Sequence, residues 1–116
     1  MSEFDQALEE LAQILGDARA AAVLETSGIE LAVWGSADFE AVTAEVSELW
    51  RTVTSSEGLN PEPPEFVAVH KPDGSWIVLP LGSDYLLALL AGPDLPVGKV
   101  RFYAQEWAQE HREAFA

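Results

Sequence analysis

The sequence contains no cysteine and few basic residues. Without cysteine the chain has no disulfide framework, no cysteine-ligated zinc and no thiol nucleophile. Six Lys and Arg stand against twenty Asp and Glu among 116 residues, which gives a formal net charge of −14. A charge of this sign repels phosphate backbones and anionic lipid surfaces. We therefore expect neither nucleic acid nor a membrane surface as a partner.

A long apolar segment is also missing. The longest apolar run, Tyr85 to Ala91, is far shorter than the roughly 18 residues that a membrane-spanning helix needs. The opening residues, Met1 to Asp5, are acidic, whereas secretory and organellar leaders are basic. These features favour a cytoplasmic location. A domain typically takes roughly 100 to 200 residues, so we expect residues 1–116 to form a single domain.

Hydrophobic periodicity predicts helices and strands in a mixed order. Helices are expected over residues 4–15, 39–53 and 100–115, and strands over residues 20–25, 29–34, 66–71, 75–81 and 85–91. Gly28 should take a positive φ in the first turn between strands, and Ser36 or Asp38 should cap the second helix. Residues 55–65 contain Gly and three prolines, which favours a Pro-rich mobile loop.

The connections between the expected strands determine the fold class. Tight turns join 20–25 to 29–34 and 66–71 to 75–81, which requires antiparallel pairing. The uninterrupted apolar run 85–91 is typical of a strand covered on both faces, so it should be central. A sheet with a doubly buried centre needs helices on both sides. The sequence thus predicts an α/β (α+β) sandwich with a five-stranded antiparallel sheet and three helices.

Motifs for catalysis or cofactor binding do not occur. The glycine-rich phosphate loops and the hydrolase elbow G-x-S-x-G are absent from the sequence. The only histidines, His70 and His111, have no obvious Ser or acid partner at a local spacing. This favours a strand residue or subunit contact for His70, and a residue of the last helical turn for His111, over catalytic roles. Acids three apart, such as Glu45 and Glu48, favour a solvated helix face over a metal site. We expect no catalytic residue, cofactor or metal, and therefore not an enzyme.

Two features favour association with another protein. The apolar stripe of the second expected helix ends in the large Trp50 and is wider than one short helix over a small sheet requires. The strand that begins at Phe66 follows the Pro-rich loop and contains no acid as far as Lys71. An edge strand in that position can pair with a second copy, whose interface must exclude most acids because each copy carries −14.

Three segments, in their order and spacing, resemble the roadblock (dynein light chain) family in its bacterial and archaeal form. Residues Ala20 to Ala32 look like the family's first hairpin, and Ile77 to Leu90 are similar to its fourth and fifth strands. Pro96 to Arg101 resembles the Gly-x-x-Arg start of the family's closing helix. The likeness extends from Leu8 to His111.

The resemblance implies a roadblock, profilin-like sandwich with strand order 2-1-5-4-3. It also implies a homodimer, or a dimer with a paralogous roadblock subunit, in which the third strands pair edge to edge and the second helices pack together. The implied interface residues are Val46, Leu49, Trp50, Val53, Phe66, Val67, Ala68, Val69 and His70. Roadblock proteins of bacteria and archaea act as non-catalytic regulators or scaffolds of small Ras-like GTPases, including a polarity regulator of gliding motility. The expected function is the same.

One alternative function remains open, that of a small-ligand sensor. Similar α/β sandwiches hold ligands between sheet and helices, in pockets with a few convergent polar groups. Here the expected inner faces look filled by Leu, Val and Trp, which disfavours such a pocket. The strong acidity has two interpretations, a partner with a basic patch or simple solubility.

Overall fold

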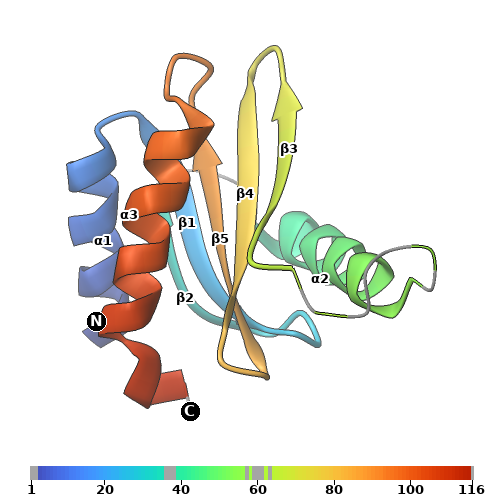
Figure 1. Cartoon of the computed structure of the whole chain (residues 1–116). Coiled ribbons are helices and arrows are strands. Elements are labelled where there is room, and N and C mark those ends of the chain that lie inside the picture. Colours follow the sequence, from blue (N-terminus) through green and yellow to red (C-terminus); the bar gives the residue numbers. More distant parts are fainter. Residues whose placement is uncertain (1–2, 36–38, 57, 59–61, 63, 116) are drawn as a thin grey trace.

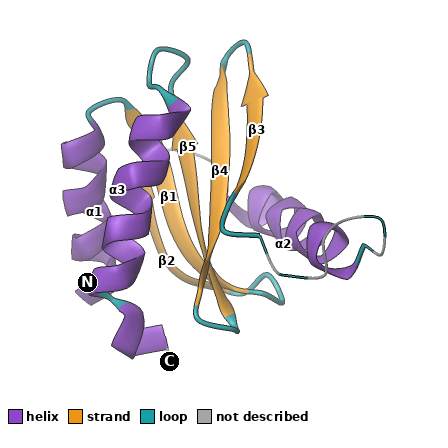
Figure 2. Cartoon of the chain, in the orientation of Figure 1, coloured by secondary structure: helices purple, strands orange, loops and turns teal. Residues whose placement is uncertain are grey.

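A five-stranded antiparallel sheet separates two helical layers (Figure 1). The computed structural model describes residues 3–35, 39–56, 58, 62 and 64–115. The elements, in chain order, are α1 (Glu3–Leu15), β1 (Ala18–Glu25), β2 (Glu30–Gly35), α2 (Phe39–Ser55), β3 (Val67–Lys71), β4 (Gly74–Leu81), β5 (Tyr85–Ala91), α3 (Val97–Glu110) and the short 3-10 helix η1 (Arg112–Phe115). Figure 2 shows α1 and α3 side by side on one face of the sheet and α2 alone on the other.

The strand order is β2-β1-β5-β4-β3, which confirms both the predicted fold class and the order implied by the resemblance. Every neighbouring pair is antiparallel. The apolar strand β5 is central, and its residues Leu86, Leu87 and Leu89 are 0% exposed. Burial on both faces explains why this strand lacks polar alternation. The edge strands are β2 and β3.

Two turns lie side by side at one end of the sheet. Gly28, in the turn between β1 and β2, has φ +102°, which confirms its predicted positive φ. The backbone N–H of Thr26 in that turn donates to the carbonyl oxygen of Asp84 in the turn between β4 and β5, at 2.9 Å. This hydrogen bond holds the two turns together opposite α2.

The layer of α1 and α3 covers the larger part of the core. Leu8, Leu11 and Leu15 of α1 are buried against the sheet, together with Val100 and Trp107 of α3. Two side chains also link the helices. The Trp107 indole N–H donates to the carbonyl oxygen of Ala7 at 3.1 Å, and Lys99 Nζ donates to that of Leu15 at 3.3 Å.

The opposite layer is thinner. Alanines of the central strands, Ala20, Ala22 and Ala88, face α2, and Val46 and Trp50 of that helix are buried against them. Small residues on the sheet and a single helix leave more space on this face than on the other.

The last helix differs at both ends from the periodicity-based prediction, residues 100–115, but its start agrees with the resemblance at Pro96 to Arg101. The helix begins at Val97, directly after Pro96, and ends at Glu110. His111 leaves the helical conformation with φ −102° and ψ 11°, and its Nδ1 donates to the carbonyl oxygen of Trp107 at 2.9 Å. The chain then turns in η1 and places the Phe115 ring 5.0 Å from the ring of Phe4. Contact with α1 thus replaces a further helical turn.

The predicted loop and the predicted caps of α2 lie partly outside the described residues. The predicted loop, residues 55–65, starts one residue too early, because α2 extends to Ser55. The loop's predicted mobility concerns in part residues 57, 59–61 and 63, which lie outside the described residues, as do Ser36 and Asp38, the predicted caps of α2. In the part of the chain that the structure describes, no helix is long and apolar enough to cross a membrane.

Candidate functional site

The nine predicted interface residues differ in solvent exposure. On α2, Val46 and Trp50 are 6% and 8% exposed because they pack on the sheet, whereas Leu49 and Val53 are half-buried. Phe66 and Val67 are also half-buried. Ala68, Val69 and His70 are exposed. The surface still open to a partner is therefore β3 together with the outer flank of α2.

Strand β3 is an edge, and within the described residues no strand pairs with its outer side. Val69 lies opposite Trp76 in the pairing with β4, on the face that carries α2. His70 lies opposite Ser75, on the face that carries α1 and α3. The strand runs from Val67 to Lys71 without an acid, so its free backbone edge is not guarded by negative charge.

A groove of about 240 Å³ follows this edge between α2 and the β3–β4 hairpin. Its lining residues are Val42, Glu45, Val46, Leu49, Val69, Lys71, Trp76 and Val78. Six of these eight side chains are apolar, so the groove joins the half-buried flank of α2 to the exposed Val69. An apolar strip thus lies beside the open edge of the sheet.

The chain just before β3 is anchored to α3. The Arg101 guanidinium carbon lies 4.9 Å from the centroid of the Phe66 ring, and Arg101 Nη2 lies 3.8 Å from Glu65 Oε2. A cation over an aromatic face contributes about 0.5–1 kcal/mol at exposed sites. These contacts hold the start of β3 against α3 and leave the outer edge of the strand free.

His70 and Ser75 form a hydrogen-bonded pair, a contact that the sequence analysis did not expect. The hairpin places His70 Nδ1 2.7 Å from Ser75 Oγ. Ser75 is only 2% exposed, and the hydrogen bond to His70 satisfies its buried hydroxyl across the two strands.

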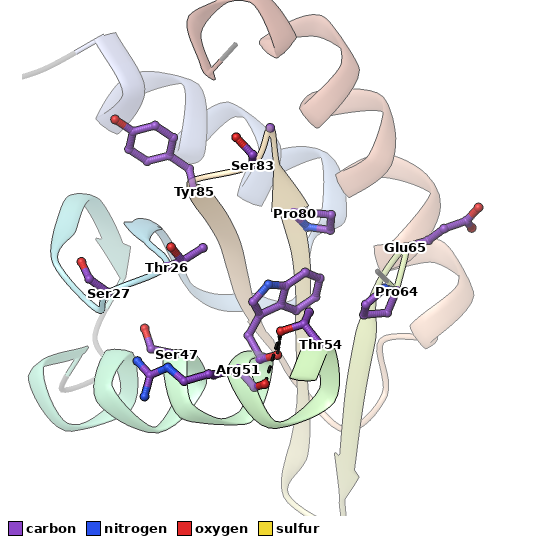
Figure 3. A pocket seen from close by; sticks show the side chains of 12 residues that line it. Thr26, Ser27, Ser47, Arg51, Thr54, Pro64, Glu65, Pro80, Ser83 and Tyr85 are labelled. Carbon is purple, nitrogen blue, oxygen red and sulfur yellow. Dashed lines mark hydrogen bonds between the residues drawn. The ribbon is translucent and has the colours of Figure 1, made fainter. Parts of the chain in front are cut away.

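A larger cavity lies between α2 and the end of the sheet where the two turns meet (Figure 3). Its volume is about 850 Å³. The lining residues are Thr26, Ser27, Ser47, Trp50, Arg51, Thr54, Pro64, Glu65, Pro80, Gly82, Ser83 and Tyr85. The expectation that Leu, Val and Trp fill the inner faces is wrong here, because small and polar residues of the two turns face α2.

Ionisable groups do not assemble into a metal centre among the described residues. No group of three or more His, Asp or Glu side chains in residues 3–35, 39–56, 58, 62 and 64–115 is placed to hold a metal ion. What the site offers is an open strand edge, an apolar groove and a cavity with hydroxyls and one arginine.

Neither a protein-family model nor a curated protein matches this sequence. Solved structures, in contrast, match its fold over nearly the whole length. A Roadblock/LC7 domain from Streptomyces avermitilis has a TM-score of 0.88 at 21% identity, covering 97% of this chain and 98% of that one. MglB from Myxococcus xanthus has a TM-score of 0.87 at 13% identity, covering 99% and 96%.

Two further structures define the breadth of this likeness. The gliding protein MglB from Thermus thermophilus has a TM-score of 0.85 at 19% identity, covering 95% of this chain and 86% of that one. LokiProfilin2, solved in a complex with rabbit actin, has a TM-score of 0.71 at 15% identity, covering 97% and 98%. The chain therefore has the roadblock fold, a profilin-like α/β sandwich.

Proposed function

We propose that two copies of this chain pair through β3 and α2, and that the dimer is a non-catalytic scaffold or regulator of a small Ras-like GTPase. The observation that carries the proposal is the open, acid-free edge of β3 beside an apolar groove. The fold shared with MglB and with Roadblock/LC7 domains supports it.

Pairing of two β3 strands extends both sheets into one. The backbone groups at the free edge gain hydrogen bonds, and the groove gives the partner's α2 an apolar surface to cover. Each chain carries a net charge of −14, so two copies repel each other over most of their surface. Strand β3 contains no acid, so pairing at this edge avoids that repulsion. Leu49, Val53 and Val69 become buried at the centre of the interface. One of the similar structures is an MglB with a tetrameric arrangement, which supports self-association of this fold.

A rigid dimer can regulate a GTPase without supplying catalytic groups. It holds the partner in one orientation, and its charge steers the encounter. Each chain of the dimer carries a formal charge of −14, which favours a partner with a basic patch. A paralogous roadblock chain in place of the second copy leaves this role unchanged.

The dimer is tested by Val69→Asp. This change introduces a carboxylate at the pairing edge, where burial without a partner costs several kcal/mol, about 3–5. Light scattering at micromolar concentration should show a dimer for the wild type and a monomer for the variant. The matched control is Leu31→Asp, because Leu31 is 44% exposed on the other edge strand and Val69 is 38% exposed. The interface is misplaced if Val69→Asp stays dimeric or if only Leu31→Asp dissociates.

The GTPase partner is tested with purified small GTPases encoded beside the gene. We expect calorimetry to show binding of the GTP-loaded form to the wild type and to Leu31→Asp, and weaker binding to Val69→Asp. Hydrolysis rates measured with and without the dimer distinguish a regulator from a scaffold. If no GTPase binds in either nucleotide state while the dimer forms normally, the GTPase role is wrong and the dimer stands.

A further inference from the structure

The cavity between α2 and the two turns carries groups that the proposed dimer does not use. Of the nine predicted interface residues, only Trp50 lines it, so the cavity lies on the other flank of α2 from the groove. Its volume of about 850 Å³ falls within the range of roughly 300–1,000 Å³ that is typical of small-molecule sites. Figure 3 shows the polar side chains of α2 and of the turns gathered around it.

Ser47 is the first group that points to a ligand. The residue is 3% exposed, and its Oγ is a buried polar atom without a hydrogen-bond partner among the described residues. Other hydroxyls on α2 bond back to the helix: Thr54 Oγ1 donates to the carbonyl oxygen of Trp50 at 2.9 Å, and Ser55 Oγ to that of Arg51 at 2.6 Å. A buried hydroxyl normally finds a partner. Ser47 lines the cavity, where a ligand can supply one.

Ser47 is also held in place by the turn above it. A Cβ built on Gly28 would lie 3.3 Å from Ser47 Oγ, and the φ of +102° at Gly28 is one that other residues rarely adopt. The absence of a side chain at Gly28 therefore lets this turn pack closely against Ser47. Thr26 and Ser27 of the same turn line the cavity beside Ser47.

Arg51 is the second group. It lies four residues after Ser47 on α2, so both side chains leave the same face of the helix. The Arg51 side chain is exposed and lines the cavity. Glu65, the acid among the lining residues, lies 3.8 Å from Arg101 instead. The planar guanidinium is thus available to bind a carboxylate or phosphate with two parallel hydrogen bonds.

The remaining walls are largely apolar. Trp50 forms the floor on α2, and Pro64 and Pro80 close the sides. The Tyr85 ring points away and packs 5.4 Å from the Phe115 ring. Flat rings and prolines suit an apolar ligand body, while Arg51 and Ser47 suit one charged end. Because the chain carries a net charge of −14, it repels a dianionic ligand more strongly than a monoanionic one.

We propose that this cavity binds a small organic monocarboxylate, with its carboxylate on Arg51 and the Ser47 hydroxyl and its apolar body against Trp50 and Pro80. The site makes the small-ligand hypothesis specific. It does not depend on the dimer or on a GTPase, because it is built within one chain.

The test uses phenylacetate, indole-3-acetate and octanoate as probes, with phenylacetamide and phenyl phosphate as comparison compounds. Amide chemical shifts of the full-length protein, measured by NMR during titration, should move at residues 47–54 and in the two turns. The carboxylates should bind more tightly than the neutral amide and the dianionic phosphate. Strongest binding by phenyl phosphate would overturn the monocarboxylate assignment.

Two variants locate the binding groups. Arg51→Gln should weaken phenylacetate by roughly tenfold, the loss expected for a charged hydrogen-bond partner, and leave phenylacetamide unchanged. Ser47→Ala should weaken phenylacetate by roughly threefold. The matched control is Arg112→Gln, which makes the same charge change in η1, away from the cavity, and should leave binding unchanged.

Three results would overturn the proposal. They are no shift with any carboxylate at millimolar concentration, shifts that map away from α2 and the turns, and equal losses in Arg51→Gln and Arg112→Gln. Light scattering of Arg51→Gln separates this proposal from the dimer, because the variant should keep the oligomeric state of the wild type whether or not it binds the probes.

Discussion

The two faces of the sheet use the same strands but are packed differently. On one face, large side chains such as Ile77, Leu79 and Leu89 meet two helices that are linked to each other by side-chain hydrogen bonds. On the other face, alanines such as Ala22 and Ala88 meet the single helix α2, and the cavity and the groove lie beside that helix. The comparison shows that the more fully packed layer lies on one face of the sheet, whereas the cavity and the groove lie on the other.

The largest expected difference between the faces involves two neighbouring leucines of β5. Leu89 is 0% exposed and faces α1 and α3, whereas Leu90 is half-buried and faces α2. Leu89→Ala should lower the free energy of unfolding by about 2–5 kcal/mol, because it leaves a cavity in a filled layer. Leu90→Ala should lower it by about 1 kcal/mol. Urea unfolding at one fixed protein concentration measures both, and equal losses would show that the two layers are packed alike.

A smaller difference is expected between two buried tryptophans. Trp107 donates its indole N–H to Ala7 and packs between two helices, whereas Trp50 borders the cavity. Trp107→Phe should lower the free energy of unfolding by about 1–2 kcal/mol through the lost hydrogen bond and contacts. Trp50→Phe should lower it by less, about 0.5 kcal/mol, because fewer atoms surround the lost ring. A larger loss for Trp50→Phe would contradict the assignment of the open face.

The smallest losses of stability are expected at two buried serines. Ser75 is hydrogen-bonded to His70, whereas Ser47 has no partner among the described residues. Ser75→Ala should lower the free energy of unfolding by about 1 kcal/mol. Ser47→Ala should leave it unchanged or raise it slightly, because it removes a buried polar atom that makes no bond. Thermal unfolding of both variants, without added ligand, tests the pair. A clear loss in Ser47→Ala would mean that its hydroxyl is already satisfied.

Most of the fold followed from local patterns. Period-3.6 and period-2 spacing located the helices and strands, and the uninterrupted run 85–91 placed β5 at the centre. The error at the last helix has a non-local cause, because Phe115 packs on Phe4 from the other end of the chain. The apolar spacing of residues 100–115 continues through His111 and gives no sign of that contact.

Less of the candidate site than of the fold could be predicted from the sequence. The position of the strand after the Pro-rich loop predicted an edge strand, and the structure confirms that β3 is an edge. The apolar stripe of α2 did not distinguish Trp50, buried within the chain, from Leu49, still half-exposed, because periodicity reports which side of a helix is apolar and not what covers it. Ser47 gave no signal, since polar residues on a helix usually face water.

The sequence by itself determined the order of the elements, the antiparallel hairpins and the strand free of acids, because these depend on the period of apolar residues, on turn residues and on charge along the chain. Only the tertiary structure decided which face of the sheet is filled and where space remains. That outcome depends on the summed volumes of side chains from segments far apart, such as the turns at Thr26 and Ser83 opposite Ser47. Local patterns do not encode such sums.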